Sequence, residues 1–180
     1  MKNFAVACAV LIAVASGLAN TRKVPPEEPF ATIRIPDDWQ IKEHPEIIEA
    51  TPPDKTVCLL IAAVERNKAA ETIGETMQYL RNRDRIVMKS ESRHDEEGRI
   101  NAIPAHFVSW QGKNKDGDME LKFTIVTLGK SQSLVAAYDG SLSALEKHHS
   151  ELDEILKSIA KIESASGEGE GDKDSKTEKE

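Results

Sequence analysis

Alternating apolar and polar residues cover much of the chain between residues 30 and 138, which predicts a domain rich in β-strands. The stretch at residues 56–64 differs because nearly every position in it is apolar. It is too short for a typical globular helix, and prolines precede it while charged residues follow it. We therefore predict a strand in the interior of a sheet, covered on both faces.

Three short strands are expected before this central strand. Residues 30–35 alternate, and a turn at 36–38 leads to a second strand in which Trp39 is the expected core anchor. These two strands are expected to form the first hairpin. A third short strand is predicted over 44–49.

The spacing of apolar residues changes after the central strand. Ile73, Met77 and Leu80 recur at helical spacing and predict a helix over residues 68–85 with one buried stripe. Its polar side would carry residues such as Glu75.

Four hairpin-linked strands are predicted next, over residues 87–94, 99–111, 121–125 and 134–138. Residues 95–98 would form the first connecting turn, and Asp116 with Gly117 the second. Pro104 has no backbone donor, so an edge position or a bulge is expected there.

A last helix is predicted to start at Ser143, which forms a capping-box pair with Glu146, and to continue to Ile162. His149 falls on its apolar stripe. Strands joined by tight turns must be antiparallel, and two helices with one apolar stripe each can cover a sheet. The predicted fold is α+β, an antiparallel β-sheet sandwiched by two main helices.

Both ends of the chain differ from this domain. Residues 1–19 have a lysine start, an apolar segment and small residues before Ala19, so we predict a secretory signal cleaved after Ala19. The apolar segment is shorter than the roughly 20 residues that cross a bilayer, so no transmembrane segment is expected after processing. A periplasmic or secreted location follows. Residues 20–29 are polar and proline-rich and are expected to form no regular element.

The other end is acidic. Residues 163–180 hold seven acids and three lysines, with no aliphatic residue larger than alanine, which predicts a disordered tail. The whole chain carries a net charge of −7, and its densest basic run is Arg81, Arg83 and Arg85. We interpret these arginines as cations suited to a helix end, and no nucleic-acid partner is expected.

After cleavage Cys58 would be the only cysteine, so no intramolecular disulfide is expected. Its place in the apolar strand indicates a buried hydrophobic residue rather than a reactive thiol.

Three stretches share the pattern of a known family: FATIRIPDDW at residues 30–39, RINAIPA at 99–105 and ILKSI at 155–159. With the helix after the buried strand, they resemble the PsbP-like superfamily, which includes PsbP, the Mog-type Ran-binding factors and periplasmic proteins similar to DcrB. Ala102 replaces the glycine of that pattern, and nothing matches the Ran-facing surface of Mog-type members. The resemblance implies a PsbP-like domain over residues 30–162. It further implies a non-catalytic scaffold that assists exported or membrane-bound machinery.

Histidines provide the candidate metal ligands. Helical spacing places His148 beside Glu151 and His149 beside Asp153, but a closed site needs three or four ligands, and a half-buried helix histidine is the alternative. His44, between two glutamates, is a weaker candidate.

Candidate hydrolytic residues also occur, but in no recognisable motif. The serines and histidines in question are Ser109, Ser133, Ser141, His94 and His106. No Gly-x-Ser-x-Gly elbow, phosphate loop or paired-cysteine motif is present, so no catalytic, cofactor or metal residue is assigned and no enzyme activity is expected.

Three hypotheses about function remain. The first is an exported, non-enzymatic module that binds an unknown protein partner in the periplasm or peripherally at a membrane surface. The second is a protein that binds a small ligand or a divalent cation, and the third is a hydrolase.

Overall fold

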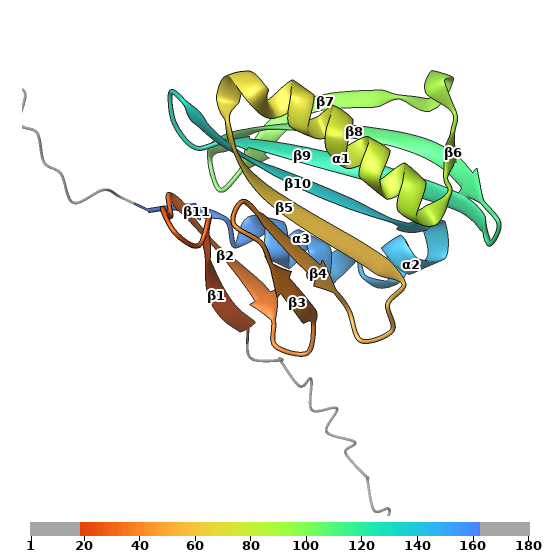
Figure 1. Ribbon diagram of the computed structural model, residues 1–180, viewed down its shortest axis with the longest axis horizontal. Coiled ribbons are helices and arrows are strands. Elements are labelled where there is room, and N and C mark those ends of the chain that lie inside the picture. Colours follow the sequence, from red (N-terminus) through yellow and green to blue (C-terminus); the bar gives the residue numbers. More distant parts are fainter. Residues whose placement is uncertain (1–18, 163–180) are drawn as a thin grey trace, which may run out of the picture.

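Two antiparallel sheets make up most of the structure, a computed structural model that describes residues 19–162 (Figure 1). Most of the predicted signal and the acidic tail therefore lie outside the described residues. The larger sheet has the strand order β3-β4-β5-β10-β9-β8-β6, with β7 paired to β8, and the smaller has the order β1-β2-β11. The strands are β1 (Ala19–Val24), β2 (Ala31–Pro36), β3 (Gln40–Glu43), β4 (Ile47–Thr51), β5 (Val57–Glu65), β6 (Val87–Met88), β7 (His94–Ile100), β8 (Ile103–Asn114), β9 (Gly117–Thr127), β10 (Gln132–Ser141) and β11 (Ala160–Lys161).

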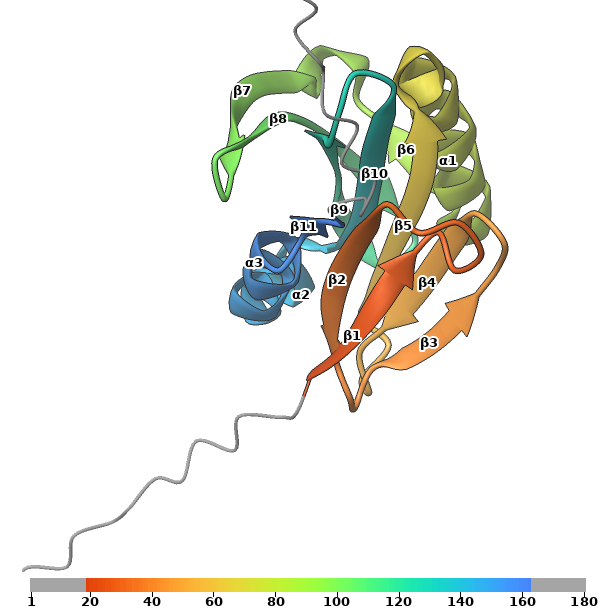
Figure 2. The same cartoon turned by 90° about the vertical axis from the view of Figure 1, so that its left-hand side faces the viewer.

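Helices lie on both sides of the larger sheet. They are α1 (Ala69–Asp84), α2 (Leu142–Lys147) and α3 (His149–Lys157). Figure 2 shows α1 on one side of the sheet and α2 and α3 on the other. The predicted α+β sandwich is confirmed. Among residues 19–162, no helix combines the length and apolar character needed to cross a membrane.

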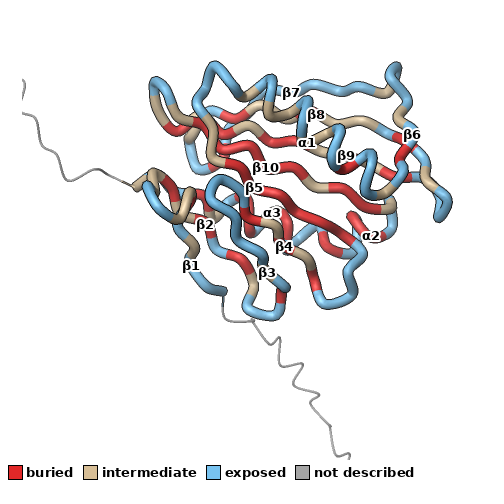
Figure 3. The backbone as a smooth tube through the Cα atoms, in the orientation of Figure 1, coloured by how far each residue is buried: buried red, intermediate tan, exposed pale blue. Residues whose placement is uncertain are grey.

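Strand β5 is the covered interior strand that the sequence predicts. Leu59 and Ile61 belong to the core on the α3 side, whereas Cys58 and Leu60 belong to the core on the α1 side. All four are buried. The buried segments concentrate in the middle of the larger sheet (Figure 3).

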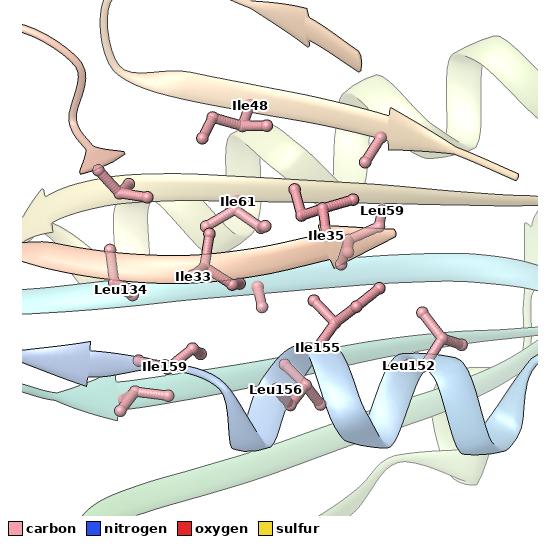
Figure 4. Packing of buried hydrophobic residues seen from close by; sticks show 14 of the residues in the cluster. Ile33, Ile35, Ile48, Leu59, Ile61, Leu134, Leu152, Ile155, Leu156 and Ile159 are labelled. Carbon is pink, nitrogen blue, oxygen red and sulfur yellow. The ribbon is translucent and has the colours of Figure 1, made fainter. Parts of the chain in front are cut away.

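The larger core joins the two sheets to α3. Ile33 and Ile35 of β2 pack with Ile155 and Leu152 of α3, and all are buried (Figure 4). Complete burial of each such side chain contributes roughly 1.5–3 kcal/mol before the entropy cost of ordering it. Trp39 belongs to the same core, as predicted.

The prediction that residues 20–29 form no regular element is wrong for their first half. Strand β1 pairs along its length with β2, from Ala19 opposite Pro36 to Val24 opposite Ala31. Val24 is fully buried. The stretch was misjudged because the prolines begin only after Val24, and because β1 gains its hydrogen bonds from a partner strand rather than from its own sequence.

The predicted first hairpin is also wrong. β2 pairs with β1 and β11, while β3 pairs with β4 in the other sheet. The turn before Trp39 exists, with the Trp39 amide donating to the Pro36 carbonyl at 3.1 Å, but it carries the chain from one sheet to the other.

The turn predicted at residues 95–98 lies instead at Asn101 and Ala102. These residues adopt φ angles of 49° and 66° and join β7 to β8 as a two-residue hairpin loop. Positive φ at both positions is typical of type I′ turns, in which asparagine is favoured. The acidic run was misjudged because β7 is exposed, so its polar side chains do not mark a turn.

The predicted last helix is two helices. It breaks at His148, and residues 160–161 form β11. Ser141, not Ser143, is the N-cap: its side chain accepts a hydrogen bond from the Ala144 amide at 3.2 Å. The break also shifts the buried stripe, so His148 is buried and His149 is exposed.

Candidate functional site: a groove beside helix α1

Helix α1 has two rows of side chains that face other parts of the protein. Leu80, with Ile73 and Met77, packs onto the sheet in the core that also contains Leu60 of β5 and Val135 of β10. A second stripe at the same helical spacing runs beside it, through Thr72, Glu75, Thr76 and Tyr79. The first stripe anchors the helix, and the second faces a hollow.

The hollow exists because one helix is narrower than the sheet it covers. A helix with its side chains is about 10–12 Å wide, whereas strands lie about 4.8 Å apart, so α1 spans about two strands. It contacts β5 and β10, and the hairpin of β3 and β4 extends beyond it. Ile48 and Ala50 of β4 are buried in the core on the α3 side, so their neighbours Ile47 and Glu49 point to the α1 side.

We call this hollow the α1 groove. Its volume is about 490 Å³. Its floor and walls come from β4, β5, α1 and the residues before β4: His44, Glu46, Ile47, Glu49, Leu60, Ala62, Ala63, Val64, Thr72, Glu75, Thr76 and Tyr79. Ile47 is 37% exposed and Tyr79 48% exposed, so two large apolar side chains are open to solvent at its edges.

A charged hollow of about 340 Å³ continues the groove past Glu49. Arg83 lies in it, and one of its terminal nitrogens donates to both carboxylate oxygens of Asp139, at 2.8 and 3.1 Å. Its Nε donates to Asp84 at 2.8 Å. From the sequence we interpreted Arg83 as a cation suited to a helix end. In the structure its guanidinium binds Asp84 at the end of the same helix and also the buried Asp139 of β10.

The two carboxyls compete for this one guanidinium. Burial, followed by the hydrogen bond to Asp84, raises the pKa of Asp139 to about 7, because water no longer solvates its charge. Burial is also the largest single influence on Asp84 and acts in the same direction, but the hydrogen bonds to Arg83 and Asp139 and the charge of Arg83 together outweigh burial and lower the pKa of Asp84. Of the two carboxyls, Asp139 is therefore the one whose protonated form its surroundings favour.

Cys58 borders the same charged hollow. Burial raises the pKa of its thiol to about 11, although the nearby Arg83 opposes the shift. The thiol is therefore protonated at neutral pH, and a protonated thiol is a poor nucleophile.

A loop before β5 forms one wall of the charged hollow, and His148 holds that loop. Lys55 and Thr56 line the hollow. The neighbouring Asp54 accepts from His148 Nε2 at 3.0 Å, while His148 Nδ1 lies 2.9 Å from Glu151. Trp39 packs edge-on against the imidazole, with 6.1 Å between the ring centroids.

These contacts favour the charged imidazolium. Burial lowers the pKa of His148, but hydrogen bonds to Glu151 and Asp54 outweigh burial and raise it above its ordinary value. A hydrogen bond from Lys147 and others from Thr56 lower the pKa of Asp54. The cluster is an ion-pair network that ties the loop to α2 and α3.

The structure separates most of the predicted metal candidates. His148 and Glu151 do meet, but both ring nitrogens face carboxylates. His149 is exposed, and Asp153 pairs with Lys157 at 2.6 Å. His44 lies in the α1 groove. Within residues 19–162, no group of three or more histidine, cysteine or acidic side chains is arranged to hold a metal ion.

The serine and histidine candidates are dispersed too. His94 lies opposite Ser109 in the β7–β8 ladder, and both line a hollow of about 300 Å³, but no hydrogen bond joins them in the described part of the chain. His106 Nε2 lies 3.2 Å from Asp95. The remaining two serines have structural positions: Ser133 is fully buried and Ser141 caps α2.

Sequence reasoning missed the α1 groove. One signal was present, since Thr72, Thr76 and Tyr79 form a second stripe of moderate polarity between the buried and the charged sides of the helix. The other half of the groove depends on which strands flank β5. Patterns within single strands do not contain that information.

Comparisons with known proteins concern the fold. No protein-family model matches the sequence, and a search of curated proteins finds no match. Among solved structures, cyanobacterial PsbP (CyanoP) from Synechocystis sp. PCC 6803 matches with a TM-score of 0.54 and 10% identity, over 82% of this chain and 96% of that one. A crystal structure from Bacteroides thetaiotaomicron matches with a TM-score of 0.51 and 10% identity, over 76% of this chain. This chain spans 47% of the length of the Bacteroides protein.

A structure of a mutant of the protein Mog1 matches with a TM-score of 0.48 and 10% identity, over 78% of this chain and 95% of that one. The fold is similar to that of cyanobacterial PsbP, as the sequence resemblance implies. At these identities the likeness concerns the fold alone.

Proposed function

We propose that the protein is an exported, non-enzymatic interaction module whose α1 groove binds a segment of a partner protein. The observation that carries this proposal is an open, largely apolar hollow beside a helix, with Ile47 and Tyr79 exposed at its edges. Binding surfaces often combine such exposed apolar and aromatic side chains with a polar rim. Location in the periplasm or at a membrane surface belongs to the same proposal, because it rests on the predicted signal at residues 1–19.

The chemistry around the groove supports binding rather than catalysis. Cys58 has a raised pKa, and the carboxyls of Asp84 and Asp139 are engaged with Arg83. A catalytic reading would need a nucleophile within hydrogen-bond reach of a base. The apolar floor formed by Leu60, Ala62 and Val64 instead offers area for burial.

A site-specific cross-linking experiment tests the proposal. A photoreactive amino acid is placed at Tyr79 in the groove or, as a matched control, at Val87, which is 72% exposed outside it. Both proteins are expressed in the native organism and irradiated. We expect a discrete cross-linked species from position 79 that is absent from position 87, and its loss when Ile47→Ser is added.

Two other cross-linking outcomes would contradict the proposal. Cross-linking that is equal at both positions, or that persists with Ile47→Ser, would mean that the α1 groove is not the contact surface. Unchanged thermal unfolding of Ile47→Ser is the control for folding, because substitutions at exposed positions usually change stability by no more than about 0.5 kcal/mol.

A small apolar ligand is the second candidate, favoured by the groove volume of about 490 Å³, within the usual range of about 300–1,000 Å³ for ligand pockets. A ligand that binds only the folded state raises the melting temperature. A panel of neutral amphiphiles that raises the melting temperature of the wild type, but not that of Tyr79→Ser, would favour this candidate. No shift with any compound would remove it.

A further inference from the structure

The rim of the α1 groove carries carboxylates on both of its walls. Glu46 precedes β4 on the hairpin wall, and Glu75 lies on the α1 wall, with the apolar floor between them. Within the described residues, neither forms an ion pair. The third glutamate, Glu49, is bonded to Lys42 at 2.9 Å. The two walls therefore present negative charge that the protein does not neutralise by direct pairing.

Two cations of the adjoining charged hollow are already engaged. Arg83 is bound by Asp84 and Asp139, and Lys42 by Glu49. Lys55 lines the charged hollow, at the end away from Glu46 and Glu75. The net charge of −7 on the whole chain adds to the negative field around the groove.

The apolar floor and the two rim carboxylates determine which kind of ligand fits the α1 groove. An anionic lipid head group or a fatty-acid carboxylate would be repelled by both walls, whereas a wholly apolar segment would leave the two carboxylates without a complement. A segment with an apolar side chain between two cations would bury the apolar group on Leu60 and Ala62 and place one cation near each wall.

We propose that the α1 groove binds a protein segment in which an apolar side chain is flanked by lysine or arginine. This inference rests on the proposed function, because it specifies the partner of the same groove. The apolar contact supplies most of the affinity, since both carboxylates lie at the exposed rim. Each carboxylate adds about two- to fivefold, with a marked dependence on salt.

Selection from a random peptide display library provides the test. The wild-type protein is the bait, and enriched peptides are then titrated against three variants. Glu46→Gln with Glu75→Gln removes the rim charges, Ile47→Ser with Tyr79→Ser removes the apolar edges, and Glu96→Gln with Glu97→Gln removes two charges from the exposed strand β7 as a control.

The expected result has three parts. Enriched peptides carry lysine or arginine on both sides of an apolar residue. The rim variant binds them about four- to 25-fold more weakly at low salt and nearly as well as the wild type at high salt. The apolar variant loses binding, and the β7 variant keeps it.

Other outcomes separate this inference from the proposed function. Peptides of neutral or acidic character that bind the rim variant and the wild type equally, but not the apolar variant, would overturn the charge inference and leave the groove as a binding site. Peptides that bind all three variants equally, or no enrichment at all, would overturn both.

Discussion

His148 lies at the break between α2 and α3 and joins that part of the chain to the loop before β5. Its two ring nitrogens face carboxylates from segments 94 and three residues away in sequence, Asp54 and Glu151. The side chain is 7% exposed, so the imidazole is shielded from water, whereas the carboxylates of Asp54 and Glu151 are 28% and 49% exposed. The sequence pointed to this helix but placed the buried histidine one position too late, at His149.

A change of pH should reveal the contribution of His148. A raised pKa in the folded state means that the stabilisation is complete below the unfolded value of about 6.5 and is lost as pH rises through the folded value. We expect His148→Gln to lower the free energy of unfolding by about 1.5–3 kcal/mol near pH 6, the usual contribution of hydrogen bonds to charged groups. The deficit should shrink toward pH 9.

Urea unfolding of both proteins at a series of pH values measures this difference. The matched control is His149→Gln, which changes the adjacent, exposed histidine at the start of α3. Asp54, Glu151 and Lys147 also face or flank the imidazole, and all three are retained in both variants. A deficit that grows with pH would contradict the assigned direction of the shift.

At the scale of elements, the errors of the sequence analysis share one origin. Strand β1 and the short β11 both pair with β2, and neither is marked strongly by its own sequence. Strand β7 is exposed at six of its seven positions, so its polar residues indicated a turn. In each case a partner strand supplies the hydrogen bonds that fix the element.

The cap of α2 provides a test at this scale. Ser141→Ala removes the side-chain acceptor of the Ala144 amide and should cost about 1 kcal/mol of unfolding free energy. Ser143→Ala removes the residue that the sequence favoured as cap. It should change stability by less than about 0.5 kcal/mol, because Ser143 is exposed and does not cap the helix.

Chemical denaturation of the two variants compares them directly. Equal losses would show that the two hydroxyls, which lie 3.2 Å apart, share the capping role. A larger loss for Ser143→Ala would restore the capping box with Glu146 that the sequence predicted.

At the scale of the whole molecule, the sandwich creates the candidate site. Two helices and the small sheet cover one face of the large sheet broadly, whereas α1 alone covers part of the other (Figure 2). The part of the large sheet beside α1 that no helix covers forms the floor of the α1 groove. The loop that His148 holds forms one wall of the charged hollow. The site therefore follows from how layers of unequal width stack.

Processing at the N-terminus is a prediction for the whole molecule. Cleavage after Ala19 would leave Asn20 as the first residue and keep the rest of β1 paired with β2. Intact-mass measurement of protein from the native envelope should give the mass of residues 20–180. Ala19→Lys should block cleavage, because the peptidase requires a small residue there. Recovery of the wild type with Met1 in place would contradict the predicted signal.

The sequence alone determined the features that depend on local burial. The continuous apolar run was enough to predict the central strand, and apolar residues spaced three to four apart were enough to predict α1. Alternation with a period of two predicted the other strands and, with the helices, the sandwich, because the residue types on each face of an element differ according to whether that face is buried. Only the tertiary structure decided that β2 and β3 belong to different sheets, that His148 rather than His149 is buried, and that β4 leaves a groove beside α1. Those outcomes depend on which distant segments pair, and pairing is chosen by free energies summed over the whole molecule rather than by any one stretch.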